Sequence, residues 1–525
     1  MLRREFLQSA LTLGAGAMSW MLVPKLSARE AAREQVDVTL VGRPYRFAAD
    51  TGADFDGLAY NGRVPGQLLR VRYGQRLRAR YLNRTGGPST VHWHGMILPN
   101  AMDGVPDVTQ KPVPNGGEFI YTFKPDPPGF RWYHSHVGDQ IALGLFGPFL
   151  IEDPGEARAD VEVVLVLHDV PRMSSLRAAL AGRSNAAMDV PPGVGGMAGM
   201  SGQGASSMHG MSGMQGTGAM KDMSGMGDMS AMPGMGAMAR GRAMGDEVAY
   251  LSHCLSGAAY PHTRPLTVRV GQTVRLRILN ASPTLTHYVR LGGHQLRITH
   301  SDGNPLPRAV TVDALRIGVG ERYDAWFEVT KPGAWLLQSL MADVDDRRQA
   351  VLIRTPDAAD REPELPPSSL RAAKCFDYLL AGGEHAGGVP ARMSAGTADA
   401  RGRRQVSVDL TLGGGEPGTW RWTIDGKIWP HTPKVQVRAG DQVLIRFRNP
   451  NDMDHPMHLH GHIFELVELS GRRLENPLRK DTALVPAHGS AAWRFIADAP
   501  PGRWLLHCHN LVHMMDGMVT EVDYL

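Results

Sequence analysis

The chemistry-bearing residues of this chain are densest near its C-terminus. Residues 507–513 read His-Cys-His-Asn-Leu-Val-His, and Met518 follows five residues later. Because side chains alternate between faces along a strand, the cysteine would face away from its two neighbouring histidines. One cysteine, histidines and a weak axial methionine describe a blue-copper site. Cys508, His513 and Met518 can therefore hold one copper, while the two histidines beside the cysteine reach a second metal site, which gives electrons a covalent route between the two.

A strand-like segment that could position these residues occurs three times. Each copy begins with glycine, carries apolar residues at alternate places and ends with asparagine nine positions later. The copies run from 74 to 83, from 271 to 280 and from 440 to 449. A two-residue period after a glycine turn predicts a half-buried strand of an antiparallel sheet. Three copies in register indicate three equivalent structural units.

The first and third units also share two His-x-His pairs at equivalent positions. These pairs are His92 and His94, His134 and His136, His458 and His460, and His507 and His509. In the middle unit, counting from the repeated asparagine places Val289 and Leu291 at the first pair, and counting from a Pro-Gly turn places Gln338 at the start of the second. The middle unit therefore keeps the strands and lacks the ligands.

A single His-x-His pair on a strand is more often a surface feature than a ligand pair, but four pairs at matched repeat positions are not explained in that way. Eight imidazoles at one interface would repel each other if protonated and would lack hydrogen-bond partners if dry. Metal ions resolve both problems, and eight ligands suit a cluster of about three ions.

Short strands separated by Gly/Pro turns predict an all-β fold of three consecutive Greek-key β-sandwich domains. We place domain 1 at residues 33–155, domain 2 at 156–355 and domain 3 at 401–525. Residues 356–400 are rich in Pro, Ala and Gly and are predicted to be a linker.

Residues 1–32 have the features of an export signal. Arg3 and Arg4 precede an apolar run from Ala10 to Val23, as in a twin-arginine signal peptide. This pattern predicts export of the folded chain by the twin-arginine machinery to a bacterial periplasm, and an uncleaved membrane anchor is the alternative. Elsewhere the sequence contains no second long apolar run, so no stable membrane span is expected in the mature chain.

The chain has 525 residues and a formal net charge of +4, which is small for its size and argues against a nucleic-acid binder. Besides Cys508, only Cys254 and Cys375 are present, and they could form a disulfide or remain buried thiols.

A methionine-rich insert is expected in domain 2, at about residues 190–245. Residues 197–244 contain 13 methionines, most of them three residues apart, among Gly, Ser and Ala. Such a segment cannot bury enough apolar surface to fold alone and is predicted to be disordered. Its thioethers could gather additional Cu(I), with His209 as a further ligand. The alternative is a low-complexity loop with adaptable methionine packing.

Taken together, the histidine-rich motifs resemble those of the multicopper oxidases. The matching motifs are His92-Trp93-His94-Gly95, His134-Ser135-His136, His455-Pro456-Met457-His458-Leu459-His460, and His507-Cys508-His509 with His513 and Met518. The resemblance covers essentially the whole mature chain and implies three cupredoxin-like domains with four copper ions. It implies type 1 copper on His455, Cys508, His513 and Met518, type 2 copper on His92 and His458, and a type 3 pair on His94, His134, His136, His460, His507 and His509.

The same resemblance implies the reaction, in which four one-electron oxidations of a donor reduce dioxygen to water. Asp103 matches a family carboxylate near the cluster and is expected to relay protons, with an Asp-Gly turn residue as the alternative. Many bacterial relatives have an acidic residue directly after the histidine of the last motif, where this chain has Met514, so the second relay group is left open.

The methionine-rich insert favours one electron donor. Periplasmic copper-resistance oxidases carry such segments and oxidise Cu(I), which makes a cuprous oxidase the leading hypothesis. Phenol oxidation of the laccase type is the second. A copper-sequestering protein with little turnover is a third, against which the complete ligand set argues. We expect a monomer.

Overall fold

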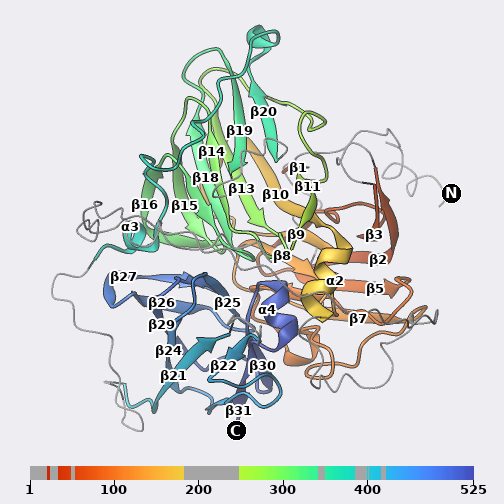
Figure 1. The fold of residues 1–525 in the computed structure, drawn as a ribbon, viewed down its shortest axis with the longest axis vertical. Coiled ribbons are helices and arrows are strands. Elements are labelled where there is room, and N and C mark those ends of the chain that lie inside the picture. The colour runs from red at the N-terminus through yellow and green to blue at the C-terminus, as the bar shows by residue number, and fades with distance from the viewer. Residues whose placement is uncertain are drawn as a thin grey trace, which may run out of the picture.

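The computed structural model describes residues 21–23, 34–48, 54–181, 248–340, 349–384, 399, 401–414 and 421–525. Three β-rich domains follow one another along the chain and meet near the centre of the molecule (Figure 1). The predicted methionine-rich insert and most of the predicted export signal lie outside the described residues.

Domain 1 consists of two four-stranded sheets. In spatial order the first contains β3 (Phe55–Tyr60), β2 (Gln35–Phe47), β5 (Arg76–Asn83) and β7 (Glu118–Phe123). The second contains β4 (Leu69–Arg72), β9 (Phe146–Glu152), β8 (Gly129–His134) and β6 (His92–His94). Along β5, Leu77, Ala79 and Tyr81 are buried and the arginines between them are exposed, which confirms the predicted half-buried strand.

Domain 2 has the same two-sheet plan. One sheet contains β1 (Met21–Leu22), β10 (Val161–Pro171), β13 (Thr273–Asn280), β18 (Arg322–Glu328), β15 (Leu296–Ser301) and β16 (Asn304–Val312), with β11 (Tyr250–Leu255) also paired to β10. The other contains β12 (Leu266–Thr267), β20 (Ala350–Arg354), β19 (Ala334–Leu340), β14 (His287–Leu291) and β17 (Leu315–Ile317). β1 comes from the predicted export signal and pairs with Val163 and Val164 of β10.

The repeated strand of domain 2 differs from its copy in domain 1 because its outer face is covered. Arg275 and Arg277 are each only 1% exposed at the side chain. They pair with Glu156, Glu162 and Asp324, so the charges are buried together. The alternation in sequence therefore marks two buried faces here, one apolar and one ionic.

Domain 3 closes the chain with two further sheets. The first contains β22 (Thr423–Ile424), β21 (Gln405–Gly413), β24 (Gln442–Arg448), β29 (Ser490–Ile496), β26 (Phe464–Leu469) and β27 (Arg472–Lys480). The second contains β23 (Val435–Val437), β31 (Val519–Tyr524), β30 (Arg503–Cys508), β25 (His455–Leu459) and β28 (Thr482–Val485). The structure is mostly β, as predicted.

The repeated asparagine has the same structural role in each domain. The side-chain amides of Asn83, Asn280 and Asn449 each donate to a carbonyl in the loop that follows and to a second carbonyl 30, 37 and 36 residues later, respectively. Each side-chain oxygen accepts from the backbone N–H two residues on. These buried hydrogen bonds fix the loop that leads to the next strand.

The helices lie between strands and at the domain junctions. They are α2 (Met173–Ala181), α3 (Tyr378–Gly382) and α4 (Leu511–Asp516), with short 3₁₀ turns η2 (Asn100–Met102) and η3 (Pro356–Ala358). Among the described residues, no helix has the length and apolarity needed to cross a membrane. All three cysteines are described, and none is joined to another by a disulfide.

Residues 356–384 of the predicted linker are packed against domains 2 and 3. Phe376 and Tyr378 are buried. The Tyr378 hydroxyl donates to Glu321 of domain 2 (2.6 Å) and accepts from the backbone N–H of Leu484 in domain 3 (3.0 Å). This segment therefore joins the two domains by specific contacts.

Candidate metal centre

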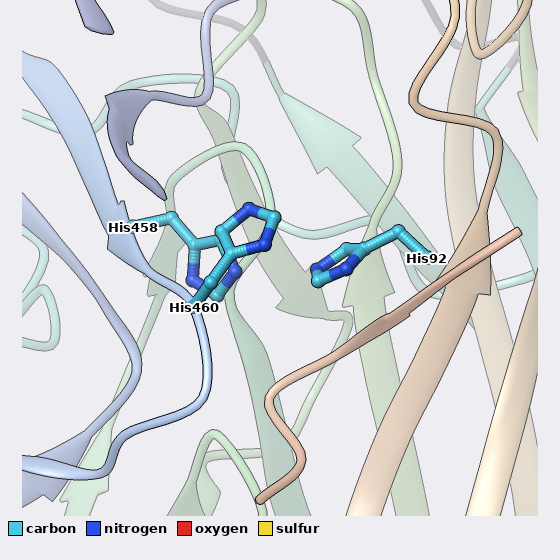
Figure 2. Close-up of side chains that lie close together, drawn as sticks. All are labelled: His92, His458 and His460. Carbon is cyan, nitrogen blue, oxygen red and sulfur yellow. The ribbon is translucent and has the colours of Figure 1, made fainter. Parts of the chain in front are cut away.

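The four His-x-His pairs are brought together where domains 1 and 3 meet. In domain 1, β6 and β8 pair so that His92 lies opposite His134, and in domain 3, β25 and β30 pair so that His458 lies opposite His507. Across the domain boundary, the rings of His92 and His460 stack at a centroid distance of 3.9 Å. Figure 2 shows His92 pointing from domain 1 toward His458 and His460 of domain 3.

The middle domain offers different residues at these places. Its β14 and β19 pair so that Arg290 lies opposite Gln338. Arg290, and not Val289 as counting from Asn280 suggested, therefore occupies the position of His92 and His458. The count fails because the loop between Asn280 and β14 is one residue longer than the loop between Asn449 and β25. The conclusion that this pair of ligands is missing from the domain still holds.

The eight clustered histidines divide into sets of three that share a small space. The nitrogen atoms of His92, His458 and His460 lie within 4.8 Å of one another, as do those of His136, His460 and His507. A further set consists of His94, His134 and His509, whose ring centroids are separated by 5.0 to 5.7 Å.

Hydrogen bonds to carbonyl groups show which nitrogen of each ring faces the cluster. The Nδ1 atoms of His92, His134 and His458 donate to backbone carbonyls at 2.8 to 2.9 Å, and their buried Nε2 atoms have no hydrogen-bond partner. A carbonyl oxygen only accepts, so each Nε2 keeps its lone pair. His94 is reversed, because its Nε2 contacts the Asp481 carboxylate (3.1 Å) and its buried Nδ1 is without a partner.

A second, separate group lies in domain 3. Sγ of Cys508 is 3.4 Å from Nδ1 of His513 and 3.7 Å from Nδ1 of His455, and the two nitrogens are 3.1 Å apart. A point in the plane of these three atoms lies about 2.0 Å from each, close to the bond lengths of first-row metals to nitrogen and sulfur. Met518 is fully buried, and its backbone N–H donates to the His513 carbonyl (3.0 Å).

Local sequence explains how α4 positions His513. The side chain of Asn510 caps the helix by accepting from the backbone N–H groups of Val512 and His513. Gly517 ends the helix at a φ of 115° and turns the chain toward Met518. A Cβ at Gly517 would lie 2.6 Å from Cβ of Ile428, so the turn also requires glycine for space.

Comparison with known proteins agrees with this geometry. Three family models, each described as multicopper oxidase, match residues 46–156, 210–355 and 403–524. Multicopper oxidase MmcO of Mycobacterium tuberculosis is 30% identical over 520 residues, which cover 98% of this chain and 92% of MmcO. The chain belongs to the multicopper oxidase family. It is therefore a copper enzyme that passes electrons to dioxygen.

The chain is also similar to two further proteins at lower sequence identity. Copper resistance protein A of Escherichia coli is 26% identical, with 99% of this chain and 98% of that protein covered. The crystal structure of the Botrytis aclada laccase superposes with a TM-score of 0.66 at 21% identity, over 93% of this chain and 87% of the laccase. The latter similarity supports the three-domain fold alone.

The donor set of this multicopper oxidase fits copper. Nε2 of His460 and Nε2 of His507 lie 3.0 Å apart, and both rings already donate through Nδ1, to Asp103 and to the Cys508 carbonyl. Two lone pairs this close repel each other unless a cation lies between them. Imidazoles in the cluster and a thiolate with two imidazoles at the separate site are ligand sets that copper prefers.

Burial keeps the cluster imidazoles neutral. Burial is the main cause that lowers the pKa of seven histidines well below 6.5, and the charges of neighbouring imidazole rings are the next cause. The seven are His94, His134, His136, His455, His458, His460 and His509. Burial also lowers the pKa of His507 to about 4. Metal binding requires a neutral imidazole, so these ligands are ready to bind at neutral pH.

The copper-free protein should therefore lose stability in mild acid. In the unfolded chain these histidines titrate near 6.5, whereas the folded state keeps them unprotonated, so below that pH the unfolded state binds more protons. Each such histidine lowers the free energy of unfolding by up to about 1.4 kcal/mol per pH unit. We expect the melting temperature of the copper-free protein to fall steeply from pH 6.5 to 5, and that of the copper-loaded protein to fall much less. Parallel pH curves for the two forms in calorimetry would contradict this.

Asp103 contacts both sides of the cluster. Its side chain accepts from His460 Nδ1 (2.9 Å), and its backbone carbonyl accepts from His92 Nδ1 (2.8 Å). The carboxylate is fully buried at the end of η2, and its second oxygen, Oδ1, lies 3.2 Å from His92 Nδ1. Asp103 also precedes Gly104, which has a φ of 82°, so it lies in a turn as well, and its role as a proton relay stays a prediction.

Met514 does not supply a second carboxylate, and its surroundings are apolar. Its half-buried side chain packs with Val105, Leu505 and Val519, and with Val108 at the edge. An ionised carboxylate at this position would have to be desolvated among these side chains.

Asp481 is a site residue that the sequence did not reveal. It bonds His94 through its side chain and His458 through its backbone carbonyl. It lies outside every repeated motif. Its partners His94, Arg131 and Arg322 belong to other domains, so no sequence pattern identifies it.

The middle domain retains a hydrogen-bonded counterpart of the mononuclear group. Register places Ser339 at the position of Cys508 and His287 at that of His455. Ser339 Oγ lies 2.8 Å from His287 Nδ1, and Asp169 bridges His287 Nε2 (2.9 Å) and His253 Nδ1 (2.5 Å). Hydrogen bonds therefore join here the residues equivalent to Cys508 and His455 of domain 3.

Proposed function

We propose that this multicopper oxidase oxidises Cu(I) in the bacterial periplasm, as part of copper tolerance. Four Cu(I), one O2 and four protons give four Cu(II) and two H2O. Similarity to copper resistance protein A of Escherichia coli and of Pseudomonas syringae supports this donor. The twin-arginine pattern in residues 1–32 supports the location.

The observation that carries the proposal is the place where the methionine-rich tract joins the fold. Residues 197–244, with 13 methionines, fall in the sequence between α2 and β11. α2 packs against α4, the helix that holds His513, and the two helices lie side by side in Figure 1. Leu176 of α2 and Leu511 of α4 are both buried. α2, the described element that precedes the tract in sequence, thus lies beside the helix that holds His513, and soft thioethers near it would deliver Cu(I) to the mononuclear group.

We assign the ligands as follows. His455, Cys508, His513 and Met518 hold type 1 copper; His92 and His458 hold type 2 copper; His94, His134, His136, His460, His507 and His509 hold the type 3 pair. Copper bound at these sites supplies one-electron transfer and dioxygen reduction.

The residues of the chain supply the geometry and the protons. Cys508 is bonded through the backbone to His507 and His509, so the thiolate is covalently continuous with two cluster ligands. The same strand thus joins the mononuclear group to the cluster, and the His507 ring is fixed by its bond to the Cys508 carbonyl (2.9 Å). A carboxylate oxygen of Asp103 lies 2.9 Å from His460 Nδ1, which supports a role in passing protons toward the cluster.

Oxygen uptake with two donors tests the choice of substrate. A variant with all 13 methionines of residues 197–244 replaced by serine keeps the length of the tract. We expect its rate on low concentrations of Cu(I) to fall about tenfold, as for about 1.4 kcal/mol of lost donor binding, and its rate on a phenol to be unchanged. Deletion of the tract should give the same split.

The other outcomes identify the other hypotheses. If the wild-type protein consumes oxygen with a phenol but not with Cu(I), it is a laccase-type enzyme and the cuprous-oxidase proposal is wrong. If neither donor supports oxygen uptake while the protein binds Cu(I), the protein sequesters copper. Equal loss of both rates in the serine variant would show that the tract acts on the fold and not on the donor.

A further inference from the structure

We propose that the middle domain, which supplies none of the cluster histidines, sets the position of the type 2 and type 3 ligands through Arg322 and Asp481. The proposal makes Arg322 a positioning residue, since it touches neither a reacting atom nor a histidine nitrogen. It rests on the assignment of His94 and His458 as copper ligands and is independent of the electron donor.

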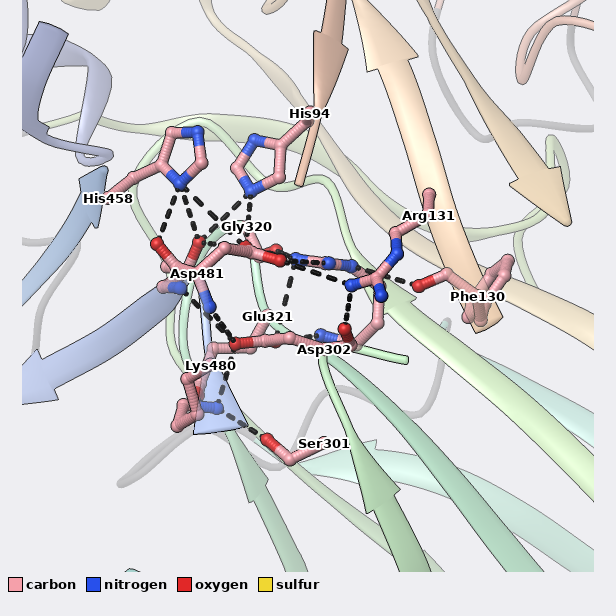
Figure 3. Close-up of polar contacts among 12 residues, drawn as sticks. His94, Phe130, Arg131, Ser301, Asp302, Gly320, Glu321, His458, Lys480 and Asp481 are labelled. Atoms are coloured by element: carbon pink, nitrogen blue, oxygen red, sulfur yellow. Dashed lines mark hydrogen bonds and ion pairs between the residues drawn. The ribbon is translucent and has the colours of Figure 1, made fainter. Parts of the chain in front are cut away.

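Asp481 is the residue through which Arg322 of domain 2 reaches the cluster histidines (Figure 3). Its Oδ1 lies 3.1 Å from His94 Nε2, and its backbone carbonyl accepts from His458 Nδ1 (2.8 Å). One residue thus holds a ligand from domain 1 and a ligand from domain 3. Because a carboxylate accepts the Nε2 proton of His94, the Nδ1 lone pair is the one left to face the metal.

Arg322, at the start of β18 in domain 2, holds the Asp481 carboxylate by two parallel hydrogen bonds. Nη1 donates to Oδ1 (2.7 Å) and Nη2 donates to Oδ2 (2.6 Å). Such a planar pair fixes the carboxylate plane as well as its position. Arg131 of domain 1 is more distant, with Nη1 at 3.4 Å from Oδ2. Arg322 is therefore the main cationic partner of Asp481.

The ionic charges around this pair balance. Arg131, Arg322 and Lys480 lie among Asp302, Glu321 and Asp481, and all six side chains are fully buried. Burial alone would lower the pKa of Arg322, but the charges of Asp481 and Asp302 raise it, so it stays ionised. Burial would raise the pKa of Asp481, and the Arg322 charge lowers it below its ordinary value. Removal of one member leaves an unpaired buried charge next to the cluster ligands.

Two glycines show how closely domain 2 approaches the ligands. A Cβ at Gly95, which follows His94, would lie 2.4 Å from Asp481 Oδ2 and 2.6 Å from Arg322 Nη2. A Cβ at Gly320, whose carbonyl accepts from Arg322 Nη1, would lie 3.1 Å from the His509 ring. Gly95 therefore has room only for hydrogen, and a Cβ at Gly320 would be closer to His509 than an ordinary van der Waals contact. Domain 2 is thus packed closely against the ligand motifs.

The test compares Arg322→Met with Arg277→Met. Arg277 lies in the same sheet of domain 2, is as deeply buried and is paired with Glu156, Glu162 and Asp324, but contacts no cluster histidine. Copper is titrated into each copper-free protein while the blue absorption reports the type 1 site and electron paramagnetic resonance reports type 2 copper. In Arg322→Met we expect the free copper needed to half-fill the type 2 site to rise about 10- to 100-fold, with blue absorption per chain unchanged. Arg277→Met should keep both signals.

Three outcomes would overturn the proposal. The first is a type 2 copper affinity in Arg322→Met equal to that of the wild type. The second is an equal loss of type 2 affinity in Arg277→Met. The third is a loss of blue absorption in Arg322→Met that parallels the loss of type 2 copper. If Arg322→Met does not fold, Arg322→Lys decides, because it keeps the charge and loses the planar fork. Wild-type affinity of the type 2 site for copper in Arg322→Lys overturns the proposal. Reduced affinity with intact blue absorption supports it. A wild-type protein that itself shows no type 2 signal would instead contradict the ligand assignment.

Discussion

Replacing Cys508 with serine should abolish both the intense blue absorption and oxygen uptake. The hydroxyl would occupy nearly the same space beside His455 and His513, but it is not ionised at neutral pH and is a hard ligand that copper does not favour. The absorption at roughly 600 nm depends on the thiolate–Cu(II) bond and should be absent. Turnover should fall roughly a thousandfold or more, a barrier increase of about 4 kcal/mol. Absorption spectra and oxygen-electrode rates on the same samples measure both effects.

Cys375→Ser is the matched control, because Cys375 lies outside both metal groups and is half-buried. It should keep the colour and the rate. Copper analysis of Cys508→Ser should show a loss of about one copper per chain with the cluster copper retained. Blue absorption that survived in Cys508→Ser would remove this residue from the mononuclear site.

Replacing Asp103 with asparagine should lower turnover by about 10²- to 10⁴-fold, the range for loss of a proton-transfer group. The amide keeps the size of the side chain but cannot accept a proton at the oxygen 2.9 Å from His460 Nδ1. Since the backbone carbonyl still accepts from His92, we expect the ring of that ligand to stay in place. Oxygen uptake under saturating donor, together with copper content and blue absorption, gives the measurement.

Asp107→Asn is the control for this variant. Asp107 lies four residues further along the same loop, is partly exposed and pairs with Lys111 at the surface. It should leave turnover unchanged. If Asp103→Asn were slow only in proportion to a loss of copper, Asp103 would be a structural support of His92 and His460 and not a relay.

Much of the fold followed from local periodicity. The three Gly-to-Asn segments became β5, β13 and β24 because each encodes an apolar face at alternate positions, and the asparagines hold equivalent loops. The histidine pairs could also be predicted from the sequence, because strand pairing is set within each repeat. His134 and His507 therefore occupy equivalent positions, opposite His92 in domain 1 and His458 in domain 3. The two-residue period of a strand shows which face of its own sheet a residue occupies.

Features that depend on contacts between domains could not be read from the sequence. Arg322 begins β18 of domain 2, and Asp481 lies 159 positions later, between β27 and β28 of domain 3. The periodicity of these strands reports only the sheet to which each strand belongs. The register that puts Arg290 opposite Gln338 depends on one added loop residue, which a fixed count misplaces. The alternation along β13 predicts that Arg277 faces solvent, whereas in the structure Glu156 and Glu162 cover it.

The serine at position 339 has a consequence for the order of events in catalysis. Where domain 3 has the sulfur of Cys508, domain 2 has Ser339, whose hydroxyl is bonded to His287. An alcohol in that setting offers no redox-active partner to a donor docked on domain 2. Under the proposed ligand assignment, the four reducing equivalents pass one at a time through the Cys508 thiolate. The turnover rate then cannot exceed the rate at which the donor delivers four electrons to this one site.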